Sequence, residues 1–225
     1  VYLYKNAEKA AVGELAGGSG FLVSVPCADN PGMVYSYVVT NRHVIDQDYL
    51  TIRLNTEGGG VDIIETGSGE WNRSQTNDIA VVPVALDRTK HAFARIPLSQ
   101  FITQELINEL GIGMGDDVFL VGRLIDCTGR QQNTPSARFG NIAMMPYERI
   151  HNEHIDHDAE AFLCEIKSVG GFSGSPVFVW IPSGSHRPGS NEIVVGNQGP
   201  WLLGVDWGHT QREEPHHRQR RPEPD

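Results

Sequence analysis

The chain has 225 residues, of which 39% are hydrophobic, and this is enough for one large folded unit or two small ones. A formal net charge of −10 argues against a general nucleic-acid or anionic-membrane surface, and no apolar run approaches the ~20 residues that span a bilayer. Three cysteines, Cys27, Cys127 and Cys164, cannot all pair within one chain, and none has metal-ligand spacing.

Short runs rich in β-branched and aromatic residues, separated by turn signals, fill the first hundred residues. Glycines at 17–20 and 58–60 and a turn at 30–32 break these runs, residues 67–76 read as a polar loop, and residues 87–97 suit a linker. Many short strands with regular turns predict an all-β barrel or sandwich. We expect an edge strand over residues 1–4 and further strands over residues 21–25, 33–40, 49–54, 61–65 and 78–84.

Residues 99–110 differ, because their apolar side chains recur at helical spacing, with Ser99 as the expected cap and Gly111 as the expected end. This short helix marks the expected crossover between two halves. Residues 148–160 read as an acidic loop, and the tail over residues 209–225 has no apolar residue apart from proline and is predicted to be disordered. Strands are expected over residues 117–122, 137–145 with an interruption at Gly140, 161–167, 177–181 and 201–207, the last two as a hairpin.

A serine with a glycine near it on each side carries the first chemical signal. Gly171 and Gly174 flank Ser173 just before a β-type run, so the backbone can turn tightly there and a substrate can approach closely. Such a turn can direct backbone N–H groups at a point beside the serine oxygen, where an oxyanion forms in acyl transfer. A serine hydroxyl is a weak nucleophile, so this reading requires a base and an orienting acid elsewhere in the chain.

His43 and Asp78 supply the two missing residue types. His43 follows a β-type run and Asp78 precedes one, and the order His, Asp, Ser is one of the known linear orders of the catalytic triad. In this interpretation Ser173 attacks a carbonyl carbon, His43 moves the proton, and Asp78 fixes the tautomer of the imidazole and stabilises the imidazolium.

Around these residues, over roughly 17–208, the chain resembles the chymotrypsin/trypsin-like serine peptidases, particularly the bacterial and HtrA-like branches. Thr40 and His43 match the family's Thr-x-x-His pattern, Asp78 opens the Asp-Ile-Ala-aliphatic strand, and Ser173 lies in Gly-x-Ser-Gly, with Ser175 replacing the next glycine. The resemblance implies two packed antiparallel β-barrels, over residues 1–98 and 99–208. It also implies a serine endopeptidase that acts through an acyl-enzyme, without cofactor or metal, on a protein or peptide substrate. The oxyanion site would be formed by the amides of Gly171 and Ser173.

The resemblance assigns substrate binding to the segment that contains Asp206, Trp207 and Gly208. The family usually carries serine where Asp206 stands, close to the triad acid. If Asp206 and Asp78 are neighbours, the two carboxylates would share a proton or recruit a cation. A one-residue shift would instead turn Asp206 to solvent.

Several departures from the family pattern bear on regulation and activity. Phe172 stands where secreted trypsins carry the aspartate that pairs with a freed N-terminus, so we expect no such activation switch. Val44 replaces a cysteine that secreted trypsins bridge, and no signal-peptide core is visible, so we expect a reducing, cytoplasmic location. The family's closing strands after the Trp-Gly segment are missing, which would leave an open sheet edge.

Three functions therefore remain. The first is the endopeptidase, for which other domains of a longer polypeptide are considered as partners. The second is a catalytically silent trypsin-fold module that binds a protein partner, and the third is an esterase that uses the same site. His151, His154 and His157 lie among acidic residues, so a divalent metal site and a solvated acidic loop are both considered there, and we expect the loop.

Overall fold

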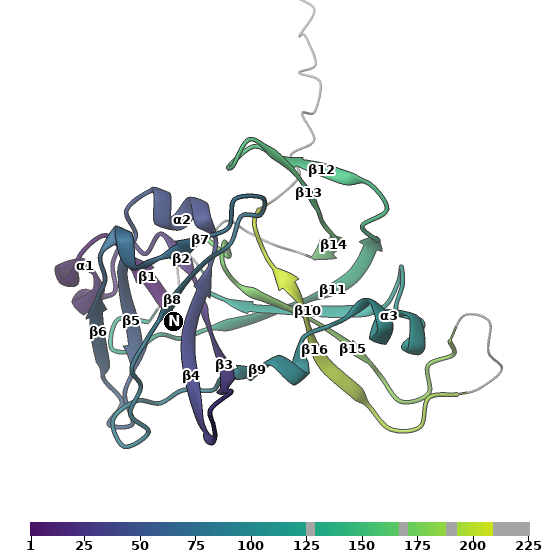
Figure 1. Cartoon of the computed structure of the whole chain (residues 1–225), viewed down its shortest axis with the longest axis horizontal. Coiled ribbons are helices and arrows are strands. Elements are labelled where there is room, and N and C mark those ends of the chain that lie inside the picture. The colour runs from purple at the N-terminus through teal and green to yellow at the C-terminus, as the bar shows by residue number, and fades with distance from the viewer. Residues whose placement is uncertain (125–128, 167–170, 188–192, 209–225) are drawn as a thin grey trace, which may run out of the picture.

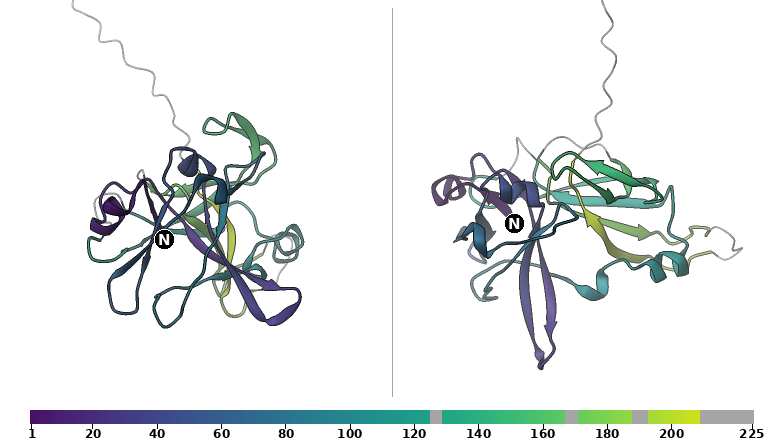
Figure 2. Two further views of the ribbon diagram at one scale, coloured as in Figure 1. Left: turned by 60° about the vertical axis from the view of Figure 1, so that its left-hand side comes forward. Right: turned by 45° about the horizontal axis from the view of Figure 1, so that its top comes forward.

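The computed structural model describes residues 1–124, 129–166, 171–187 and 193–208, and the predicted disordered tail lies outside these ranges. The described chain is built mainly of short strands, so the predicted all-β class is confirmed (Figure 1). The strands fall into an N-terminal group and a C-terminal group that lie beside one another, as the further views in Figure 2 also show. None of the described helices is long and apolar enough to cross a membrane.

The first sheet of the N-terminal half has four strands in the order β2-β1-β5-β6. The first strand lies inside this sheet with every residue buried, so its prediction as an edge strand was wrong. Helix α1 (Ala7–Val12), which the sequence analysis missed, begins at Asn6, whose side chain accepts from the amide of Lys9. The strands are β1 (Tyr2–Tyr4), β2 (Gly18–Ser19), β5 (Thr51–Asn55) and β6 (Val61–Glu65).

The second sheet of this half has five strands in the order β7-β8-β4-β3-β9, antiparallel except where β9 runs parallel to β3. Its buried side chains and those of the first sheet share one apolar cluster that includes Leu22, Val38 and Ile52. Burial of each such side chain contributes roughly 1.5–3 kcal/mol to folding. The elements are β3 (Phe21–Cys27), β4 (Asn30–Thr40), α2 (Arg42–Asp46), η1 (Ser68–Glu70), β7 (Asn72–Arg73), β8 (Ala80–Pro83) and β9 (Ile96–Pro97).

The crossover contains the predicted helix in a shorter form. A 3₁₀ turn, η2 (Leu98–Gln100), precedes helix α3 (Gln104–Leu110), so Ser99 is not the helix cap. Thr103 caps the helix instead, because its hydroxyl accepts from the amide of Leu106 at 3.2 Å. The helix ends as expected at Gly111, whose φ of 61° lies in the left-handed region.

The C-terminal half contains one five-stranded antiparallel sheet in the order β14-β11-β10-β15-β16. The predicted hairpin of the last two strands is confirmed by their direct pairing. Strand β11 is not interrupted at Gly140, where a side chain would meet the carbonyl oxygen of Glu165, so the glycine permits a close approach of two strands. The strands are β10 (Asp117–Gly122), β11 (Ser136–Met144), β14 (Leu163–Ile166), β15 (Pro176–Ile181) and β16 (Gln198–Val205).

The segment predicted as an acidic loop is a separate two-stranded hairpin formed by β12 (Arg149–Asn152) and β13 (His157–Glu160). In Figure 1 this hairpin lies above the main sheet, with its turn directed toward α2. Asn152, beside the turn, and Ala159, near the open end, are buried, so the hairpin is held at both ends although most of its side chains are polar and exposed.

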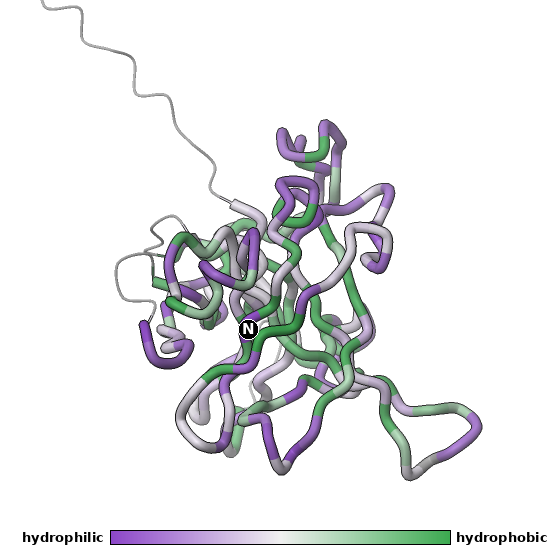
Figure 3. The backbone as a smooth tube through the Cα atoms, turned by 90° about the vertical axis from the view of Figure 1, so that its left-hand side faces the viewer, coloured by the Kyte–Doolittle hydropathy of each residue, from purple (hydrophilic) through white to green (hydrophobic). Residues whose placement is uncertain are grey.

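A buried arginine joins the two halves. Arg53 of β5 is 0% exposed and donates to the carbonyls of Gly129 and Arg130, at 3.1 and 2.6 Å, and to Asn133 Oδ1 at 3.0 Å. Figure 3 shows that apolar residues follow the inner stretches of the chain and that hydrophilic residues occupy many of the projecting turns. The two halves are thus held by directed polar bonds as well as by apolar contact.

Candidate active site

His43 lies in the short helix α2, which begins at Arg42, two residues after the end of β4 at Thr40, and was not expected from the sequence. Asn41 stands at the N-cap position, but its side chain donates to the carbonyl of Asp78 at 2.9 Å and gives the helix no side-chain cap. The amide of His43 donates instead to Asp78 Oδ1 at 2.9 Å. A carboxylate from 35 residues away therefore satisfies an N–H group that the first turn of a helix leaves unpaired.

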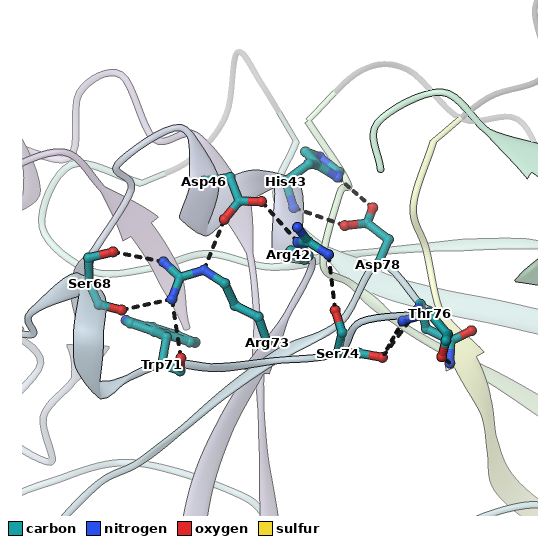
Figure 4. Close-up of polar contacts among 10 residues, drawn as sticks. Arg42, His43, Asp46, Ser68, Trp71, Arg73, Ser74, Thr76 and Asp78 are labelled. Carbon is teal, nitrogen blue, oxygen red and sulfur yellow. Dashed lines mark hydrogen bonds and ion pairs between the residues drawn. The ribbon is translucent and has the colours of Figure 1, made fainter. Parts of the chain in front are cut away.

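The same carboxylate holds the imidazole. His43 Nδ1 lies 2.6 Å from Asp78 Oδ2, and the two residues are only 8% and 3% exposed (Figure 4). With Asp78 ionised, Nδ1 carries the proton and donates it, which leaves Nε2 as an acceptor. The structure thus brings two of the predicted site residues into direct contact, while their catalytic role stays a prediction.

Ion pairs fix α2 from its outer side. Asp46, at the end of the helix, accepts from Arg42 Nε at 3.1 Å and from Arg73 Nε at 2.9 Å. Arg42 also donates to the carbonyl of Ser74 at 3.2 Å, as Figure 4 shows. These bonds join the helix to β7 and to the segment that leads to Asp78. The segments that carry His43 and Asp78 are therefore held to each other by more than the contact between those two residues.

Ser173 occupies a tight turn at the start of β15. The amide of Ser175 donates to the carbonyl of Phe172 at 2.8 Å, and Gly174 has a φ of +84°. This pattern is that of a type II turn, which requires a positive φ at its third residue and hence favours glycine there. Phe172 is 1% exposed and packs in the C-terminal core, so the residue before the serine is anchored by a buried aromatic side chain.

The serine turn is bonded to both halves of the molecule. The carbonyl of Ser173 accepts from the amide of Ser19 in β2 at 2.8 Å, and the amide of Gly174 donates to the carbonyl of Asp206 at 2.9 Å. Thr40 adds a bond from its hydroxyl to the carbonyl of Ser19 at 2.7 Å. The position of the serine is therefore set by a strand from each half.

The helix that carries His43 and the turn that carries Ser173 both lie against Gly18, but within the described ranges the two residues share no hydrogen bond. Gly18 separates the two elements, because a side chain on it would approach the Val44 methyl groups at 2.9 Å and the Ser173 carbonyl at 3.2 Å. Hydrogen bonds of catalytic groups are often long in the absence of substrate and shorten in the substrate complex. Within the described part of the chain, the amides of Gly171 and Ser173 also donate to no acceptor.

A second histidine covers the ring of the first. His154, in the turn between β12 and β13, stacks on His43 with ring centroids 4.2 Å apart and an interplanar angle of 23°. Partial burial lowers the pKa of His154 below its usual value, and the neighbouring His43 lowers it further, against the opposing charges of Asp78 and Glu153. Sequence reasoning noted His154 only within a possible metal cluster.

The other two histidines of that cluster do not join His154. His151 is paired with Asp156 and Asp158, and no group of three or more potential ligands among the described residues is arranged to hold a metal ion. The three histidines are thus dispersed over a hairpin, where the sequence predicted a loop.

Asp206, Trp207 and Gly208 follow β16 and line one cavity of about 520 Å³ that also reaches Asp78. The backbone amide of Asp206 donates to the carbonyl of Ser175 at 2.9 Å. Burial raises the pKa of Cys164 in this cavity to about 11, and the charge of Asp206 adds to the shift. The expected coupling between Asp206 and Asp78 stays a prediction, although both residues border the same space.

No protein-family model and no curated protein matches this chain. Among solved structures it is similar to the HtrA-type protease AlgW with decapeptide, with a TM-score of 0.40 and 16% identity over 87% of this chain and 64% of that chain. It is also similar to the MamO protease domain from Magnetospirillum magneticum in its apo form, with a TM-score of 0.38 and 15% identity over 80% of this chain and 90% of that chain. The chain therefore spans just under two thirds of the AlgW chain. The function proposed below rests on the geometry of the site.

Proposed function

We propose that this protein is a serine endopeptidase in which Ser173, His43 and Asp78 form the catalytic triad. The observation that carries the proposal is the pair of hydrogen bonds between Asp78 and His43. One joins the carboxylate to the ring Nδ1 at 2.6 Å, and the other joins it to the backbone amide at 2.9 Å. A carboxylate that both positions and polarises one imidazole prepares it to act as the base for a nucleophile, and we assign the nucleophile to Ser173.

The proposed reaction has two halves and needs no cofactor. Ser173 Oγ attacks the carbonyl carbon of a peptide bond, and its proton passes to His43 Nε2, which then protonates the leaving amine. Water repeats the sequence on the acyl-enzyme and restores the serine. The amides of Gly171 and Ser173 are the proposed oxyanion donors, and removal of one such donor costs about 2.7–4 kcal/mol of barrier in a well-studied peptidase.

Labelling with a fluorophosphonate, followed by intact mass measurement, tests the proposal. The wild-type chain is expected to gain one adduct, while Ser173→Ala and His43→Ala are expected to gain none. Ser175→Ala is the matched control, because this neighbouring serine is fully buried and should not react. An unlabelled wild type, or an adduct that persists in Ser173→Ala, would refute the assignment of the nucleophile.

A second candidate is a catalytically silent module that binds a protein partner. It is favoured by the lack of a hydrogen bond between His43 and Ser173 in the described chain. Absence of labelling in a folded wild-type protein would support this second candidate. Labelling with turnover of small esters, but of no peptide or protein, would instead indicate an esterase.

A further inference from the structure

The five-stranded sheet of the C-terminal half has two edge strands that line the same cavity. Its order, β14-β11-β10-β15-β16, places β14 and β16 at opposite ends. Nevertheless, all four residues of β14 and the last part of β16 line the one cavity of about 520 Å³. The sheet therefore curls until its two outer strands face each other across this cavity, which we call the strand-edge cavity.

The backbone of both outer strands offers unused hydrogen-bonding capacity toward this cavity. Among the described residues, β14 pairs only with β11, and β16 pairs with β15. The first part of β16 is covered on its other side, because Leu202 bridges to Phe101 and accepts from the amide of Ile102 at 3.0 Å. The uncovered part begins at Leu203, and this is the part that lines the cavity. Unpaired strand edges of this kind are templates for an added strand.

The floor of the cavity is apolar. Leu120, Val177 and Leu203 belong to the buried core of this half, and Phe162 and Ile166 pack against the same core. An occupant that filled the space would thus bury apolar side chains on one face. The four residues of β14 span about 13 Å at 3.3 Å per residue, so a segment of four to six extended residues matches the length of the edge.

The charged residues that the structure places around the cavity are acidic. Among the described lining residues, Glu160, Glu165 and Asp206 occur together with the buried Asp78, and no lysine or arginine occurs. Glu160 and Glu165 are exposed, so their charges are available to a bound segment. The tail over residues 209–225 contains several arginines but no apolar residue other than proline, so its composition does not suit the apolar floor.

We propose that the strand-edge cavity binds an extended segment of a partner protein, added as a strand between β14 and β16, with apolar side chains at every second position and lysine or arginine between them. The backbone of the segment bonds to both edges, its apolar face closes the core, and its basic face meets the acidic rim. This binding requires no chemistry at Ser173, so it goes beyond the proposed peptidase and is tested in its absence.

The probe is the fluorescein-labelled peptide Val-Lys-Val-Arg-Val-Lys-Val, and binding to the full Ser173→Ala chain is followed by fluorescence anisotropy. Saturable binding is expected. Two control peptides carry glutamate at the basic positions, or N-methyl groups on two adjacent central residues that remove one donor toward each edge. Both control peptides are expected to bind at least roughly fivefold more weakly. Equal binding of all three peptides would overturn the proposal.

Two sets of variants locate the binding. A side chain at Gly204 meets no atom within 4 Å, so Gly204→Val adds bulk beside the β16 edge without a clash, and a roughly tenfold loss of affinity is expected. Gly69→Val is the matched control, because Gly69 has the same open surroundings outside the cavity. Glu160→Lys with Glu165→Lys is expected to reverse the preference toward the acidic peptide, while Glu109→Lys, away from the cavity, leaves it unchanged.

The outcomes separate this inference from the peptidase proposal. Peptide binding that Gly204→Val weakens, in a protein whose wild type takes no fluorophosphonate, would support the cavity and refute the peptidase. Labelling of Ser173 together with no saturable peptide binding, or with binding that neither Gly204→Val nor the charge reversal changes, would refute the cavity and leave the peptidase standing.

Discussion

Replacement of Gly174 by alanine should destabilise the protein through the serine turn. A Cβ atom on Gly174 would lie 2.1 Å from the carbonyl oxygen of Ser19 and 2.4 Å from Thr40 Oγ1. Neither atom can easily move away, because the two are hydrogen-bonded to each other at 2.7 Å and the amide of Ser19 holds Ser173. The φ of +84° adds backbone strain for any residue with a side chain.

The magnitude follows from these two terms. A left-handed backbone conformation costs a non-glycine residue about 1–2 kcal/mol. Overpacking of a close-packed interior costs about 1–3 kcal/mol. Their sum, roughly 2–5 kcal/mol, corresponds to a decrease in Tm of about 4–20 °C for a chain of this size. Fluorophosphonate labelling should be lost in parallel, since the backbone that carries Ser173 must shift.

Thermal unfolding followed by circular dichroism measures the effect, with Gly204→Ala as the control. Gly204 has an ordinary φ and open surroundings, so its substitution should change stability by less than about 0.5 kcal/mol. If the Tm of Gly174→Ala stayed within about 2 °C of the parent, which corresponds to a loss of about 1 kcal/mol or less, the packing described for the serine turn would be refuted.

Three further predictions concern Arg53, Cys164 and His154. Arg53→Met removes three hydrogen bonds across the two halves and is expected to lower the free energy of unfolding by about 3 kcal/mol or more, measured by urea denaturation; a loss below about 1 kcal/mol would contradict the role given to Arg53. Because its pKa is raised to about 11, the thiol of Cys164 stays neutral at pH 8, so its alkylation by iodoacetamide, followed by peptide mass spectrometry, should rise about tenfold per pH unit from pH 8 to 9.5; a rate that levels off below pH 9 would argue against a buried thiol. The imidazole of His154 should titrate below pH 6.5 in NMR spectra, because its charged form is disfavoured by burial and by His43, and His43→Ala should move the midpoint back toward 6.5; an unchanged midpoint would show that the stacked ring has no influence.

Local pattern was sufficient for the strands with strong apolar runs. Strand β10 and the β15–β16 pair were predicted close to their observed positions, because their β-branched residues alternate between a buried core and a second face. The hairpin of β12 and β13 was missed because its residues are almost all polar, and only Ile150 and Ala159 hint at a pairing. Its fold depends on cross-strand bonds that composition does not reveal.

The short helix that carries His43 shows a different limit. Its five residues have no side-chain cap, so no local signal marks its start. The missing cap comes from the carboxylate of Asp78, which is distant in sequence. The helix therefore depends on the tertiary contact between His43 and Asp78, which no local pattern shows. The meeting of His43 and Asp78 was nevertheless predictable, because the order and flanking residues of the motifs identified both.

The stacking of His154 on His43 could not have been predicted, since it depends on where an unrecognised hairpin turns. The stacked ring lies beside the strand-edge cavity, because a side chain on Gly208, which lines the cavity, would come within 3.5 Å of His154 Nε2. Ala159 and Glu160 line the cavity, while the turn that precedes β13 holds His154 against His43. A strand added at β14 would therefore contact the open end of the hairpin, and the turn of the same hairpin covers the ring of His43. The hairpin of β12 and β13 thus contacts both the cavity proposed to bind a partner segment and the ring of His43. The edge of β14 is therefore the first place to look for control of this site.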